Sequence, residues 1–132
     1  MKRLLVVGVF VESEGKILIL KRNPKTESHG GLWGIPAGKV AKGETEVKAV
    51  KRELFEETGI DVEEETLERL GVYNLDSSEI KIEFPTYRLK LSNKPNVILD
   101  ANEHVGFRWV TPEECYAMKE LIHDLDYLLE EV

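Results

Sequence analysis

The stretch GKVAKGETEVKAVKRELFEETGI, residues 38–60, constrains the fold more than any other part of the 132-residue chain. Residues 45–58 within it contain neither glycine nor proline. Three apolar side chains recur there at the spacing of one helical face: Val47, Val50 and Leu54. Gly59 follows directly and is a typical helix stop. The pattern predicts an amphipathic helix over residues 45–58.

This predicted helix gathers carboxylates on its polar side. Residues three and four apart are neighbours on a helix, so Glu53 lies beside both Glu56 and Glu57, with Cβ atoms about 5–6 Å apart. Like charges at that spacing repel. A solvated acidic face is one explanation. The other is that the acids converge on a divalent cation, which would relieve the repulsion.

The rest of the chain alternates β-rich runs with turns and ends in a second helix. Residues 2–22 read as a hairpin, residues 67–75, 79–91 and 105–110 as further strands. Pro85 marks an edge or a bulge in its strand. Thr111, Pro112 and Glu114 form a helix start, after which one stripe carries Leu121, Leu125 and Leu128. We predict an α+β fold, a mixed sheet with helices packed on it, in one domain over residues 1–132.

Composition narrows the class of protein. A net charge of −7 argues against binding of duplex nucleic acid, which requires a basic surface. No apolar run approaches the roughly 18 residues of a membrane span, and the start of the chain lacks the features of a signal peptide. The lone cysteine, Cys115, is expected to be a small buried residue and suits a reducing compartment, so we expect a cytoplasmic protein. A homodimer is compatible with the sequence.

The spacing within residues 38–60 resembles the signature of the Nudix hydrolases at all nine specified positions. They are Gly38, Glu44, Arg52, Glu53, Leu54, Glu56, Glu57, Gly59 and Ile60. The preceding "GLWGIPAG" is similar to the usual lead-in of that family. The chain departs from the commonest pattern at Ala37, where many members have glycine, and at Ala41, where an acid is frequent.

The resemblance implies an α/β/α sandwich, the Nudix fold, and a phosphoric anhydride hydrolase that cleaves a nucleoside diphosphate linked to another group. It implies Mg²⁺, for which Mn²⁺ can substitute. The implied metal ligands are the Gly38 carbonyl and the carboxylates of Glu53, Glu56 and Glu57. One of these three glutamates can serve as the base instead of as a ligand. Magnesium chemistry suits such a set, because the ion takes a few carboxylates and keeps positions for water and phosphate oxygens.

Three further residues are candidates near this site. Arg52 can orient acids or contact phosphate, and its spacing from Glu44 and Glu56 favours the orienting role. Glu44 is equally an ordinary first-turn acid. Glu103, in a loop before a predicted strand, resembles an extra acid that many family members use as base or ligand, the alternative being a solvated loop acid. His104 beside it is expected to be a surface or packing histidine rather than a ligand.

Aromatic residues divide into core and candidate stacking groups. Trp109 and Phe55 are expected in the core. Three others could stack on a nucleobase if exposed: Trp33, Tyr73 and Tyr87.

Resemblance to small MutT-like members favours a nucleoside or deoxynucleoside triphosphate, cleaved to monophosphate and pyrophosphate. ADP-ribose, nucleotide sugars and dinucleoside polyphosphates remain open, as does a Nudix-fold sensor that binds nucleotides without cleaving them. An intact set of acids argues against the sensor.

Overall fold

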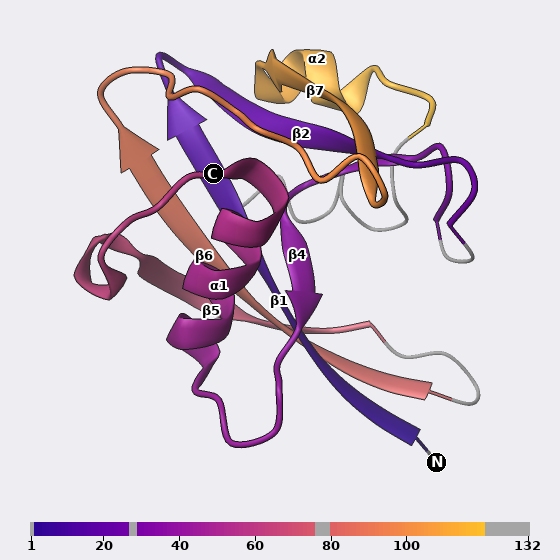
Figure 1. Cartoon of the computed structure of the whole chain (residues 1–132), viewed down its shortest axis with the longest axis vertical. Coiled ribbons are helices and arrows are strands. Elements are labelled where there is room, and N and C mark those ends of the chain that lie inside the picture. The colour runs from indigo at the N-terminus through magenta and orange to yellow at the C-terminus, as the bar shows by residue number, and fades with distance from the viewer. Residues whose placement is uncertain (1, 27–28, 76–79, 121–132) are drawn as a thin grey trace.

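The computed structural model describes residues 2–26, 29–75 and 80–120 (Figure 1). Strands, helices and one short 3-10 helix follow one another within these ranges. In chain order they are β1 (Lys2–Ser13), β2 (Lys16–Arg22), β3 (Trp33–Gly34), β4 (Ala37–Lys39), α1 (Glu46–Thr58), η1 (Glu64–Thr66), β5 (Glu68–Asn74), β6 (Ile80–Leu91), β7 (His104–Val110) and α2 (Pro112–Tyr116). The α+β prediction is confirmed.

The strands form one mixed sheet in the order β3-β2-β1-β6-β5. β4 also pairs with β1, and β7 pairs with β2. β1 and β2 make the predicted hairpin, with Glu14 and Gly15 at its turn. Both have positive φ, 54° and 77°, as a two-residue turn that matches the strand twist requires. β6 runs parallel to β1, which makes the sheet mixed.

Pro85 lies inside the sheet and not at its edge. Its strand β6 pairs with β1 on one side and β5 on the other, so the edge alternative is wrong. The ladder with β5 shifts register between Arg69 and Gly71, opposite the residue after Pro85. Because proline has no N–H to donate, irregular pairing beside it is expected. The irregularity falls on the neighbouring strand.

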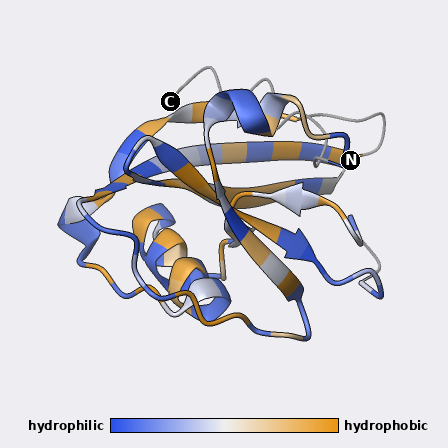
Figure 2. Cartoon of the chain, turned by 90° about the horizontal axis from the view of Figure 1, so that it is seen from above, coloured by the Kyte–Doolittle hydropathy of each residue, from blue (hydrophilic) through white to orange (hydrophobic). Residues whose placement is uncertain are grey.

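Two apolar cores cover the two faces of the sheet. Successive strand residues point to opposite faces, and the strands of Figure 2 accordingly alternate between polar and apolar colours. One core joins α1 to the sheet through Val9, Val11, Leu18, Leu20, Val50 and Leu54. The other joins α2 to the opposite face through Phe10, Ile17, Ile19, Val110 and Cys115. The helices therefore sandwich the sheet, as expected.

The boundaries of α1 follow from its caps. The Thr45 hydroxyl accepts the Lys48 N–H at 3.3 Å, which satisfies one of the free donors at the helix start. Gly59 ends the helix with φ 75°, and its N–H donates to the Phe55 carbonyl at 2.8 Å. The predicted helix and its stop are confirmed.

The start of α2 is also confirmed. Thr111 and Glu114 form a capping box, in which each side chain accepts the other residue's backbone N–H. Cys115 is a buried free cysteine, and burial raises its pKa to about 11. The predicted stripe of Leu121, Leu125 and Leu128 lies outside the described residues.

The predictions for the aromatic residues have different outcomes in the structure. Trp109 packs against the α1-side core as expected. Phe55 does not: it is 54% exposed, because the apolar stripe of α1 through Val50 and Leu54 turns Phe55 to solvent, and that prediction was wrong. Tyr87 is buried and donates its hydroxyl to Glu46 at 2.8 Å, so it presents no open face for stacking. Two aromatics pack in part on the α2-side core: Trp33 and Tyr73.

Candidate active site

The start of the site is the close contact between β4 and α1. Gly38 pairs with Val7 of β1, and the Glu53 carboxylate from α1 lies against it. A Cβ at Gly38 would stand 2.1 Å from Glu53 Cδ and 2.3 Å from Oε2. Only glycine fits there without moving Glu53. This contact explains the glycine that opens the signature.

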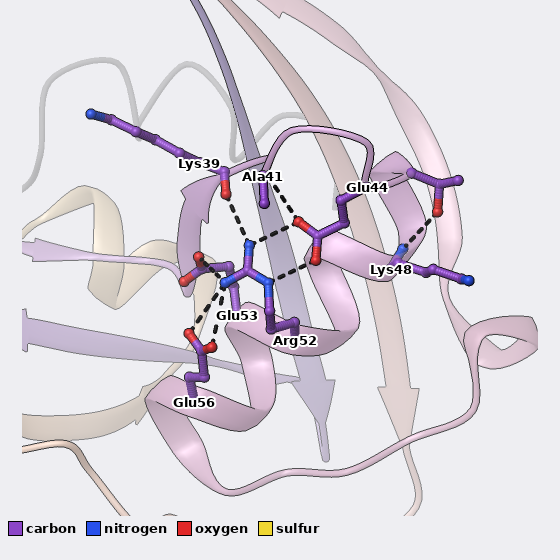
Figure 3. Close-up of polar contacts among 8 residues, drawn as sticks. Lys39, Ala41, Glu44, Lys48, Arg52, Glu53 and Glu56 are labelled. Carbon is purple, nitrogen blue, oxygen red and sulfur yellow. Dashed lines mark hydrogen bonds and ion pairs between the residues drawn. The ribbon is translucent and has the colours of Figure 1, made fainter.

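Arg52 gathers three acids around its guanidinium (Figure 3). Nε and Nη2 donate to Glu44 at 2.7 and 2.9 Å. Nη1 donates to Glu53 at 2.8 Å and to Glu56 at 3.2 Å, and Nη2 also donates to the Lys39 carbonyl at 3.0 Å. An arginine has five N–H donors, and these contacts use all of its nitrogens. The predicted contacts with Glu44 and Glu56 are present.

Glu44, just before the start of α1, is held by a backbone donor and a side-chain donor. It accepts a hydrogen bond from the Ala41 N–H at 2.9 Å and two hydrogen bonds from the Arg52 guanidinium. Hydrogen bonding to Arg52, and then to the Ala41 amide, lowers the pKa of Glu44 to about 2. The alanine at position 41 does not disturb this arrangement, because its backbone makes the contact.

Glu57 is the deeply buried acid of the cluster. Its residue is 2% exposed, and its Oε1 accepts the Ala37 N–H at 3.1 Å. Burial raises the pKa of Glu57 to about 9, with a further upward contribution from the neighbouring Glu53 charge. Burial likewise raises the pKa of Glu53, against the opposing effect of Arg52. Ala37 therefore contributes to the site through its backbone N–H. Glycine would offer the same donor, so alanine at this position removes no hydrogen bond to Glu57.

The loop before β7 brings Glu103 to this cluster. A carboxylate oxygen of Glu57, one of Glu103 and a ring nitrogen of His104 all lie within 4.8 Å of one another. The backbone fixes the loop: the Glu103 and His104 amides donate to the Asp100 carbonyl at 3.0 and 2.9 Å, and the Asn23 amide donates to the Glu103 carbonyl at 2.8 Å. The negative charge of Glu103 also contributes to the raised pKa values of Glu53 and Glu57.

The surroundings of His104 were not predicted. Its residue is 4% exposed, which agrees with a packing histidine, and burial lowers its pKa to about 4. Nδ1 is buried and has no hydrogen-bond partner among the described residues. The only sequence signal was its place directly after Glu103, at the start of a strand.

The remaining acid, Glu56, stands at the exposed rim and is held by Arg52. Within the described ranges, no ion pair reaches Glu57 or Glu103. Buried carboxylates without a cation are costly, and hard carboxylate oxygens are the ligands that divalent cations prefer. The donor set, and the close fit of Glu53 on Gly38, suit such an ion.

In the part of the chain that the structure describes, no helix is long and apolar enough to cross a membrane.

Comparison with known proteins agrees with this geometry. The chain is 34% identical over 116 residues to the CTP pyrophosphohydrolase of Escherichia coli, covering 86% of this chain and 80% of the relative. It is 30% identical over 133 residues to a putative 8-oxo-dGTP diphosphatase 2 of Mycobacterium tuberculosis, covering 97% and 82%.

Solved structures of MutT proteins share the fold. The MutT protein of Methanosarcina mazei superposes with a TM-score of 0.86 at 27% identity, covering 98% of this chain and 91% of that one. A MutT Nudix hydrolase of Burkholderia pseudomallei gives 0.83 at 29% identity, covering 100% and 99%. The NUDIX domain family matches residues 1–132. The chain therefore belongs to the Nudix family and is a pyrophosphohydrolase of that family.

Proposed function

We propose that this chain hydrolyses a nucleoside or deoxynucleoside triphosphate to the monophosphate and pyrophosphate, with Mg²⁺ as its metal. The observation that carries the proposal is the convergence of three carboxylates, from Glu53 and Glu57 on α1 and from Glu103 before β7, at the strand that holds Gly38. A triphosphate brings several negative charges to such a site. It can be accepted there only together with a cation that both sides bind.

The proposed ligands are the carboxylates of Glu53, Glu56 and Glu57 and the Gly38 carbonyl. Bound Mg²⁺ supplies charge neutralisation of the phosphates and a lowered pKa of a bound water. The water oxygen forms a new bond to phosphorus, the bridging P–O bond breaks, and pyrophosphate leaves with the electron pair. Glu103 holds the proton that the water gives up, because its carboxylate lies beside Glu57 and stays open to solvent. The alternative role for Glu103 is a further ligand.

Arg52 acts as a positioning residue in this proposal. All of its nitrogens already donate to protein oxygens, so a phosphate contact would require it to give up a bond to one of the three acids or to the Lys39 carbonyl. Those bonds fix the direction of the acids. Correct orientation of the carboxylates is the contribution of Arg52.

The substrate class rests on the relatives. The two relatives at 30–34% identity carry names that specify CTP and 8-oxo-dGTP, which are both nucleoside triphosphates. Hydrolysis of ADP-ribose, nucleotide sugars or dinucleoside polyphosphates is the alternative within the same chemistry. A non-catalytic sensor is disfavoured because Glu53, Glu56 and Glu57 are all present and point to one region.

A substrate panel tests the proposal. The purified protein is incubated with Mg²⁺ and with ordinary and oxidised nucleoside triphosphates, ADP-ribose, nucleotide sugars or diadenosine polyphosphates, and the products are identified by chromatography. We expect pyrophosphate and a nucleoside monophosphate from at least one triphosphate, and no turnover in excess EDTA. Cleavage of only the diphosphate-linked compounds would contradict the triphosphate assignment. Binding of a nucleotide without turnover of any compound would indicate the sensor.

A further inference from the structure

His104 has a buried polar atom that the described structure leaves without a partner. Its residue is 4% exposed, and Nδ1 makes no hydrogen bond among the described residues. A buried polar group without a hydrogen bond or another partner costs free energy, so such groups in native proteins usually have a specific explanation. No hydrogen bond among the described residues provides such an explanation for Nδ1.

The position of His104 supplies a candidate explanation. One of its two ring nitrogens, Nδ1 or Nε2, lies within 4.8 Å of carboxylate oxygens from Glu57 and Glu103. Backbone bonds from the amides of Glu103 and His104 to the Asp100 carbonyl hold the two residues in one tight turn. β7 then continues along β2, with His104 opposite Arg22. These backbone bonds and the β2–β7 pairing thereby hold His104 beside the acids.

We propose that His104 supplies a nitrogen ligand to the cation site at Glu57 and Glu103, and that this ligand shifts the site's preference from Mg²⁺ toward Mn²⁺. The inference rests on the proposed function for the presence of a cation at Glu57, and it takes Glu103 in its alternative role as a further ligand. It does not depend on the identity of the nucleotide. Mg²⁺ takes oxygen ligands almost exclusively, whereas imidazole suits later first-row metals and is acceptable to Mn²⁺. A site with two carboxylates and one imidazole should therefore bind Mn²⁺ more tightly than carboxylates alone would.

The test is pulsed electron paramagnetic resonance of Mn²⁺ added to the protein without nucleotide. Coupling of the electron spin to a directly bound ¹⁴N nucleus reports an imidazole ligand, and this measurement on the wild-type protein needs no variant to fold. Dissociation constants for Mn²⁺ and Mg²⁺ are measured beside it by calorimetry. The test variant is His104→Asn, which replaces the ring nitrogen by an amide of similar reach.

The matched control is His29→Asn. His29 is exposed, has φ 59°, a conformation that asparagine adopts readily, and does not belong to the Glu57–Glu103–His104 group. We expect ¹⁴N coupling in the wild type and in His29→Asn. In His104→Asn the coupling should be lost and Mn²⁺ affinity should fall about 10-fold or more, with a smaller change for Mg²⁺.

Two results would overturn the proposal in distinguishable ways. Mn²⁺ bound to the wild type without ¹⁴N coupling, or with coupling that survives in a folded His104→Asn, removes His104 from the ligand set and leaves the proposed function intact. Failure of the folded wild type to bind either ion in calorimetry removes the cation site itself and with it the proposed metal dependence.

Discussion

Two groups of acids meet around α1 under opposite electrostatic conditions. The arginine-bound cluster consists of Glu44, Arg52, Glu53 and Glu56. The buried cluster consists of Glu57, Glu103 and His104. In the first, Arg52 lowers the pKa of Glu44 to about 2. In the second, burial raises the pKa of Glu57 to about 9. Two glutamates 13 positions apart thus differ in the direction of their shift.

The difference indicates where the molecule needs a cation from outside. The arginine-bound cluster contains the protein's own guanidinium, which pairs with all three of its carboxylates. The buried cluster has no ion pair among the described residues, and its histidine is neutral at pH 7 because burial lowers its pKa to about 4. Glu53 interacts with both clusters, because it accepts a hydrogen bond from Arg52 and its negative charge raises the pKa of Glu57. Arg52 can therefore orient the edge of a site whose charge it does not cancel.

The largest expected effect comes from Glu57→Gln. The substitution removes the charge at the centre of the buried cluster with little change of volume, so turnover should fall on the order of 10³-fold or more. The metal-free variant should keep or raise its melting temperature, because a neutral amide avoids the cost of burying a charged carboxylate or of keeping it protonated. Steady-state kinetics and calorimetry measure both, with the exposed Glu65→Gln as control. Full turnover by the variant would remove Glu57 from the site.

Glu103→Gln tests whether the loop contributes to the chemistry. If Glu103 takes the proton of the attacking water, kcat should fall about 10²-fold or more while KM and melting temperature change little. The measurement is kcat at saturating Mg²⁺ and substrate. A value within about threefold of wild type, well under 1 kcal/mol in the barrier, would make Glu103 a solvated loop acid and return the base to α1.

Gly38→Ala tests the contact that aligns Glu53. The added Cβ would stand 2.1 Å from Glu53 Cδ, so the carboxylate must move, and displacement by about 1 Å can reduce turnover up to roughly 10²-fold. Ala37→Gly is the matched control, since it alters the adjacent residue and preserves the N–H that Glu57 accepts. Equal activity of the two variants would show that the position of Glu53 is not critical.

Arg52→Ala acts first on the arginine-bound cluster. Glu44 loses its paired bonds and Glu53 loses its orienting donor, so we expect about 1–3 kcal/mol less stability together with weaker Mg²⁺ binding. Arg52→Lys should recover only part of both, because one ammonium cannot reproduce the planar fork. Thermal denaturation and metal titration are the measurements. An Arg52→Ala protein of normal stability and Mg²⁺ affinity, with only KM raised, would indicate direct phosphate contact.

The smallest effect, taken for each unit of pH, is a pH dependence that isolates Glu57. An acid whose pKa is raised from 4.5 to about 9 holds a proton in the folded state that the unfolded chain releases. Stability of the metal-free protein therefore falls as pH rises from about 4.5 to 9, by less than roughly 1.4 kcal/mol per pH unit. The difference between wild type and Glu57→Gln, measured by denaturant unfolding, should show this slope. If the difference in unfolding free energy between the two proteins is constant with pH, Glu57 is not the group with the raised pKa.

Local sequence was sufficient for α1 and for the contacts within it. Thr45 and Gly59 mark its ends, and the pairing of Arg52 with Glu56 follows from four-residue spacing on one helix. Phe55 shows the limit of the same reasoning. Its type indicated the core, but the helix direction set by Val50 and Leu54 leaves it in solvent. Residue type is a weaker guide to burial than helical phase.

The sequence by itself determined the fold class, the acid-bearing helix and the family, because each depends on spacing within a continuous segment. Only the tertiary structure decided which acid is buried, that Glu53 packs on Gly38, and that Glu103 and His104 meet Glu57. Residues 57 and 103 are separated in the sequence by β5 and β6, and no periodicity links them. Their proximity results from the pairing of β7 with β2 and of β4 with β1, and from the packing of α1 on β4. Burial in that assembly raises the pKa of the glutamate and leaves the histidine neutral beside it.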